Sequence, residues 1–187
     1  MACREVIIDH YKKNWDSSPM LRPWNMGSMR TDSPAFRILE FPPTPERQMW
    51  TYATCGMSNS DSKDAIELHL FSNDQNEANT EILTAIAHYH LTSEVALSLW
   101  HTVNFGKPWV NNSECRFGLI SLPYLDGENL ENLELTDKTI KFYWLIPITE
   151  KELNYRKKFG VESLEDQFEA SNFNYSNPLR NCVIASL

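Results

Sequence analysis

The chain has 187 residues, of which 42% are hydrophobic and 12% aromatic, and its 25 acidic and 17 basic side chains give a formal charge of −8. A chain of this length is expected to form a single domain over 1–187 and to fold without disulfides or metals. Its six glycines stand too far apart for a Gly-rich phosphate loop or a GxSxG nucleophile elbow, and the acidic excess disfavours a nucleic-acid partner.

The N-terminus carries charges where a signal peptide needs an apolar run, and the longest uncharged apolar stretch, 142–148, is too short to span a bilayer. The four cysteines, at positions 3, 55, 115 and 182, form no CxxC pair that would indicate a zinc or redox site. We therefore expect a cytoplasmic protein with free thiols, no membrane contact and no cofactor. The spacing alone leaves one disulfide pair open.

The first part of the chain predicts a helix followed by strands. Residues 4–15 place apolar side chains at three- and four-residue spacing, which predicts a helix, and 16–34 collect turn-forming residues, which predict a surface connection. Short aromatic and aliphatic runs at 35–41, 48–55 and 64–71 predict three consecutive antiparallel strands. In the third, Ile66, Leu68 and Leu70 alternate with Glu67 and His69, which predicts one buried and one half-solvated face.

The middle of the chain returns to helical spacing over 76–91, which predicts a helix packed on the sheet. Strand and helix both stay open for 95–100, and 104–109 predicts a loop. A continuous apolar run at 117–122 predicts a strand covered on both faces and closed by a turn at 123–127. Residues 139–148 have the strongest alternation in the chain and predict a central strand.

Helix signals are clear near the C-terminus. Thr149 and Glu152 have the spacing of a capping box, and Gly160 follows three basic residues at 156–158, so a helix is predicted between them. A further helix is predicted over 161–170, and the Asn-rich last residues predict a tail that ends in a short strand. The order of elements predicts the α+β class: a mixed, largely antiparallel sheet flanked by helices, in a single domain.

Histidines are the first candidates for chemistry. His88 and His90 lie two residues apart on a predicted helix and point ~200° apart, so they cannot share a metal. Glu67 and His69 share one face of a strand, and His101 would complete a set of three, although nothing in the spacing brings it there. These three residues define an alternative hypothesis: a metal-dependent or hydrolytic enzyme.

Tryptophan is unusually frequent, with six in the chain. Trp15 and Trp144 fall on predicted apolar stripes and are expected in the core. Trp24 and Trp109 lie beside prolines in predicted loops, where an amphipathic aromatic side chain favours an interface with another protein. The acidic surface would suit a basic protein partner.

Five ordered blocks of the sequence carry a family resemblance. They are 48–58 (QMWTYATCGMS), 65–72 (AIELHLFS), 101–109 (HTVNFGKPW), 118–127 (GLISLPYLDG) and 142–150 (FYWLIPITE). In this order they resemble the blocks of the suppressor of fused domain family, across roughly residues 4–175.

The resemblance implies an α+β domain that binds proteins and has no catalytic activity. The animal member of the family regulates Hedgehog signalling by capturing an extended peptide of a transcription factor as an added strand between two domains. This chain matches the first of those domains, so we do not expect it to sequester a transcription factor. It looks like the short bacterial branch, for which a role as an immunity protein that neutralises a polymorphic toxin has been proposed.

Matching positions also imply candidate partner-binding residues. They are Trp50, Tyr52, Met57, Glu67, His69, His101 and Trp109. The sequence thus favours a non-enzymatic, protein-binding domain with no metal site, and the resemblance implies an immunity protein that binds a toxin domain.

Overall fold

The structure is a computed structural model, and it describes residues 2–22, 35–59 and 65–185. Within these residues the helices are α1 (Ala2–Trp15), α3 (Glu77–Thr92), α4 (Glu128–Glu131), α5 (Glu150–Phe159) and α6 (Val161–Ser171), with a 3-10 turn, η1 (Met57–Asn59). The strands are β1 (Met20–Arg22), β2 (Arg37–Phe41), β3 (Trp50–Cys55), β4 (Ile66–Ser72), β5 (Thr102–Asn104), β6 (Cys115–Ser121), β7 (Asn132–Glu134) and β8 (Thr139–Thr149).

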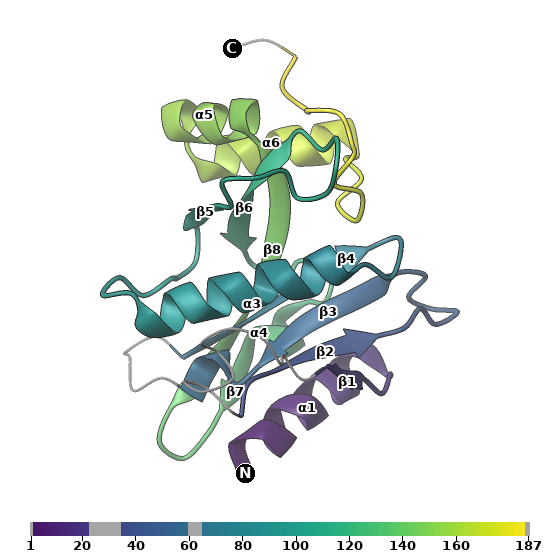
Figure 1. Ribbon diagram of the computed structural model, residues 1–187, viewed down its shortest axis with the longest axis vertical. Coiled ribbons are helices and arrows are strands. Elements are labelled where there is room, and N and C mark those ends of the chain that lie inside the picture. The colour runs from purple at the N-terminus through teal and green to yellow at the C-terminus, as the bar shows by residue number, and fades with distance from the viewer. Residues whose placement is uncertain (1, 23–34, 60–64, 186–187) are drawn as a thin grey trace.

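The strands of the described residues form one eight-stranded sheet in the order β1-β2-β3-β4-β8-β6-β5, with β7 paired to β8. Every pairing is antiparallel except that of β4 with β8. Helix α3 crosses one face of the sheet, α1 lies on the other side, and α5 and α6 lie together at the far end from α1 (Figure 1). The predicted α+β class, with a mixed and largely antiparallel sheet, is confirmed.

The central strand β8 shows how both faces of the sheet become core. Tyr143 and Leu145 pack in the cluster under α3, whereas Phe142 and Trp144 pack on the opposite face. On that opposite face α1 covers one half, and α5 with α6 covers the other. Because both faces are covered, the prediction of a half-solvated face on the third predicted strand is wrong: all seven residues of β4 are buried.

Helix ends follow the capping chemistry that the sequence indicates. The Thr149 hydroxyl accepts from the Glu152 N–H, and the Glu152 carboxylate accepts from the Thr149 N–H, which completes the predicted capping box of α5. Gly160, at φ 94°, follows the last turn of that helix. The Asn76 side chain caps α3 by accepting from Ala78 N–H.

Short elements depart from the sequence predictions. Strand β1 lies within the predicted surface connection, and β5 lies between 95–100, where strand and helix stay open, and the predicted loop at 104–109, whose first residue it includes. The tail after α6 forms turns and no strand over 172–185. Residues 23–34, including Trp24, lie outside the described part of the chain. In that part, none of the helices is long and apolar enough to cross a membrane.

Candidate functional site

The Glu67 side chain is completely buried and organises the turn after β3. Its carboxylate accepts from the Thr54 hydroxyl at 2.5 Å and from the Ser58 hydroxyl at 2.7 Å. It also accepts from the N–H groups of Gly56, Met57 and Ser58 at 2.9, 3.3 and 3.1 Å. Burial raises the pKa of Glu67, and these hydrogen bonds oppose that rise. Both oxygens of the carboxylate therefore accept hydrogen bonds that stabilise η1 and the turn before it.

His69 belongs to a second buried polar cluster on the same face of β4. Its Nε2 lies 3.3 Å from Oδ2 of Asp126, whose Oδ1 accepts from Arg47 at 2.7 Å and from the Trp15 indole at 2.9 Å. Burial, together with the charge of Arg47, lowers the pKa of His69, and Asp126 opposes that shift. Burial pushes the pKa of Asp126 upward, but the neighbouring His69 imidazole and the charge of Arg47 bring it to about 2.

The structure places most of the predicted partner-binding residues in the interior. Tyr52, Met57, Glu67 and His69 expose no side-chain surface, and Trp109 is 3% exposed. The Tyr52 hydroxyl accepts from the N–H of Asn76, and the Trp109 indole donates to Asn79 at 3.0 Å. Because these five side chains are buried, a partner cannot contact them directly in this conformation. Trp109 is therefore a core residue and not the exposed aromatic expected from its loop position.

Two of the predicted residues keep accessible surface. Trp50 is half-buried at the start of β3, where it packs against the core cluster under α3. His101 is exposed at the start of β5, and its ring nitrogens lie 3.3 Å from the N–H and the hydroxyl of Ser98. His101 also lines a surface feature that the sequence did not indicate.

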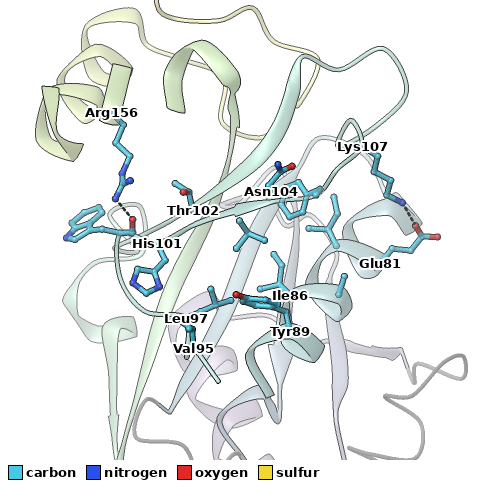
Figure 2. Close-up of a pocket in the computed structure, with 15 residues that line it drawn as sticks. Glu81, Ile86, Tyr89, Val95, Leu97, His101, Thr102, Asn104, Lys107 and Arg156 are labelled. Carbon is cyan, nitrogen blue, oxygen red and sulfur yellow. Dashed lines mark hydrogen bonds and ion pairs between the residues drawn. The ribbon is translucent and has the colours of Figure 1, made fainter. Parts of the chain in front are cut away.

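That feature is a groove of about 880 Å³ between α3 and β5, hereafter the α3–β5 groove. Figure 2 shows Ile86 and Tyr89 of α3 on one side and the strand that carries Thr102 and Asn104 on the other. Its apolar lining comes from helix, loop and strand: Ile82, Ala85, Ile86, Tyr89, Val95, Leu97, Val103 and Phe105. A volume of this size and an apolar lining are typical of a binding site.

One side of the groove is the edge of the sheet. The N–H of Phe105 donates to the carbonyl of Arg116 across the β5–β6 ladder. Because backbone groups of an antiparallel strand alternate in direction, the N–H and C=O of Thr102 and Asn104 point away from β6. Strand β5 is the last strand in the sheet order of the described residues. Those backbone groups therefore face the side of the groove, and no described strand pairs with them.

Charged residues stand at the two ends of the groove (Figure 2). At one end the Lys107 ammonium lies 3.3 Å from the Glu81 carboxylate. At the other end the Arg156 guanidinium, from α5, donates to the backbone carbonyl of Trp100 just before β5. The groove is therefore apolar along its length and polar at both ends.

The enzyme hypothesis required Glu67, His69 and His101 to meet in one cleft, and they do not. Glu67 and His69 face the side of the sheet that α1 covers, where His69 contacts the Trp15 ring. His101 lines the α3–β5 groove on the side of α3. Among the residues that the structure describes, no group of three His, Cys, Asp or Glu side chains is placed to hold a metal ion.

Comparison with known proteins identifies the family. A family model described as suppressor of fused protein (SUFU) matches residues 32–181. The chain belongs to the suppressor of fused family. A comparison with curated proteins found no match. The predicted resemblance is thereby confirmed, and suppressor of fused proteins are known to bind protein partners.

Solved structures of the suppressor of fused family share this fold. A putative SUFU homolog from Neisseria gonorrhoeae matches with a TM-score of 0.86 and 27% identity, over 100% of both chains. The Sufu–Fu complex matches with a TM-score of 0.69 and 13% identity, over 89% of this chain and 84% of that one. Drosophila Suppressor of Fused matches with a TM-score of 0.68 and 13% identity, over 96% of this chain and 50% of that one.

Most of the α3–β5 groove was not identified from the sequence. The sequence indicates His101, but it assigns Ile82 and Ile86 of α3 only to a core stripe and Arg156 only to a helix end. The sequence carries no signal for the groove: Tyr89 and Val95 line it and are 47% and 59% exposed. Their exposure follows from tertiary packing, which the local sequence pattern does not contain.

Proposed function

We propose that this chain is a non-catalytic, protein-binding domain that acts in the cytoplasm as a bacterial immunity protein and neutralises a toxin by direct binding. The observation that carries the proposal is the open edge of β5 beside the apolar α3–β5 groove. Membership of a family whose members form complexes with protein partners supports it.

The groove indicates how a partner would bind. An extended segment of the partner would pair with the outward N–H and C=O groups of Thr102 and Asn104 and add a strand to the sheet. Alternate side chains of that segment would then point toward the face on which α3 lies, against Ile86, Tyr89 and Val95. Backbone pairing supplies affinity, and the apolar contacts supply specificity.

The proposal can be tested by blocking one backbone donor. Thr102→Pro removes an outward N–H without removing a bond of the β5–β6 ladder, because proline is tolerated where an edge N–H faces outward. Thr102→Val keeps the N–H and serves as the matched control. We expect the wild type and Thr102→Val to capture a partner from the native cell and to protect a host that co-expresses the captured toxin.

Thr102→Pro should lose both capture and protection while keeping a wild-type thermal unfolding midpoint. Capture without protection of the host would refute the immunity role and leave the binding role in place. Equal capture by the Pro and Val variants would show that the partner does not bind at the edge of β5.

A further inference from the structure

Arg156 differs from Arg47 and Arg180, the two arginines that form buried ion pairs, because no described carboxylate neutralises it. Arg47 and Arg180 each donate to a carboxylate at 2.7 Å, those of Asp126 and Glu152. Arg156 is half-buried and lines the α3–β5 groove, but no described carboxylate lies within ion-pairing distance of it. A charged group in such a position gains more from an anionic partner than a fully solvated one.

The helix that carries Arg156 explains why it is unpaired. The residue one turn earlier on the same face is Glu152, whose two oxygens bind Arg180 at 2.7 and 2.8 Å. The residue one turn later is Gly160, where α5 has ended. Neither helical neighbour can therefore supply a carboxylate to Arg156.

The guanidinium is nevertheless fixed in place at the start of the edge strand. It donates to the carbonyl of Trp100, a residue in the left-handed region at φ 67°, whose N–H donates to Ile120 at 2.9 Å. The Nε of Arg156 is buried and has no acceptor. A donor that is already positioned loses little conformational freedom when it binds a ligand.

The two ends of the groove differ in local charge. Lys107 and Glu81 pair with each other at one end. At the opposite end Arg156 has no compensating acidic residue among the lining side chains (Figure 2). The groove is thus locally positive at its Arg156 end, on a protein whose formal charge is −8.

We propose that Arg156 binds a carboxylate of the partner, so that the groove selects an extended segment with alternating apolar side chains and one acidic residue at its Arg156 end. The inference rests on the proposed function, because it requires a segment of the partner in the groove. Arginine can bind a carboxylate through two parallel N–H donors, which gives geometric specificity as well as affinity. The expected partner segment is therefore acidic at this point, although the whole chain would attract a basic protein.

The test uses phage-displayed random dodecapeptides selected on the purified full-length chain. We expect alternating apolar residues with an Asp or Glu at one fixed end, and binding that is lost on Thr102→Pro. In a synthetic peptide from this selection, Glu→Gln should weaken binding to the wild type about tenfold, the size expected of a charge-assisted hydrogen bond. On Arg156→Gln the same peptide change should have less than a twofold effect.

Two further variants separate recognition from folding. Lys157→Gln removes the same charge from the next position of α5 and should keep the full preference for the acidic peptide. Arg156→Lys keeps the charge without the forked donors and should keep part of the preference. Thermal unfolding of each variant reports whether the loss of the Trp100 contact has disturbed the fold.

The outcomes distinguish this inference from the proposed function. The role of Arg156 is refuted if the selected peptides depend on the Thr102 N–H and show no preference for an acidic residue, or if Arg156→Gln keeps the wild-type preference for the acidic peptide. Either result leaves edge-strand binding in place. A selection that yields no peptide dependent on the Thr102 N–H refutes edge-strand binding, and the role of Arg156 falls with it.

Discussion

At the scale of single residues, Glu67 shows how a charged side chain becomes part of a core. It is completely buried and accepts five hydrogen bonds, three of them from consecutive backbone N–H groups. Gly56 allows that backbone arrangement because it adopts φ +104°, and a Cβ there would lie 3.3 Å from Cα of Phe36. The N–H groups of this turn therefore bind the Glu67 carboxylate in place of water.

We predict that Glu67→Gln destabilises the protein although it changes the shape of the side chain very little. One acceptor oxygen becomes an NH₂ donor that faces other donors, so buried N–H groups lose their partners. The free energy of unfolding should fall by about 2–4 kcal/mol, measured by urea denaturation. Glu94→Gln, on an exposed loop, is the control and should change stability by less than about 0.5 kcal/mol. Equal effects in the two variants would contradict an anchoring role for Glu67.

The alternation of β4 identified the right residues but not their surroundings. Glu67 and His69 do share one face, as predicted, and that face is closed by Tyr11 and Trp15 of α1. Local alternation defines which side chains point the same way, whereas the cover comes from a helix more than fifty positions earlier in the chain. For this reason a polar strip that was expected to contact solvent or a partner is an interior network.

At the scale of elements, long segments with strong periodicity were predicted and short ones were not. The helices over 2–15, 77–92, 150–159 and 161–171 and the strands β2, β3, β4, β6 and β8 all agree with the predicted segments. The strands β1, β5 and β7 have three residues each, too few to show a period. Since β5 forms one side of the α3–β5 groove, most of the candidate site could not be predicted.

A buried ion pair helps to hold the C-terminal tail to the domain. Both terminal nitrogens of Arg180 donate to Glu152, and the same carboxylate accepts from the N–H of Val183 at 2.9 Å. The Arg180 guanidinium also lies 5.1 Å from the ring centre of Phe173. This contact set joins the tail to the first turn of α5.

We predict that Arg180→Ala releases the tail and destabilises the domain by about 3–5 kcal/mol, because it leaves the buried Glu152 carboxylate without its cation. Hydrogen exchange should show faster exchange over 172–185 than in the wild type. Leu179→Ala is the matched control, since Leu179 is 55% exposed in the same segment. Unchanged exchange in Arg180→Ala would mean that apolar packing alone holds the tail.

At the scale of the whole molecule, the cluster around His69 joins parts of the chain that lie far apart in sequence. Trp15 comes from the end of α1, Arg47 from the segment before β3, His69 from β4 and Asp126 from the turn after β6. The Arg47 guanidinium also lies 5.0 Å from the Trp15 ring centre and 4.8 Å from that of Phe71. Disrupting this cluster should therefore weaken the whole domain and not one loop.

The cluster predicts how global stability depends on pH. Burial lowers the pKa of His69 below 6.5, so the unfolded chain takes up a proton near pH 6.5 that the folded chain does not. Stability from this residue is complete above pH 6.5 and is lost as the pH falls, by at most about 1.4 kcal/mol per pH unit. The pKa of Asp126, about 2 against 3.8 when unperturbed, adds a second loss as the pH falls below 3.8.

Urea denaturation of the wild type and of His69→Phe between pH 8 and pH 5 tests the first of these losses. Phenylalanine has a ring of similar size and no titrating proton, so its stability should decline less steeply below pH 6.5. His101→Gln is the control, because that side chain is exposed and lies outside the cluster. Identical slopes for the wild type and His69→Phe would show that His69 takes up its proton equally in the folded and unfolded states, and that its burial against Trp15 and Asp126 does not oppose protonation.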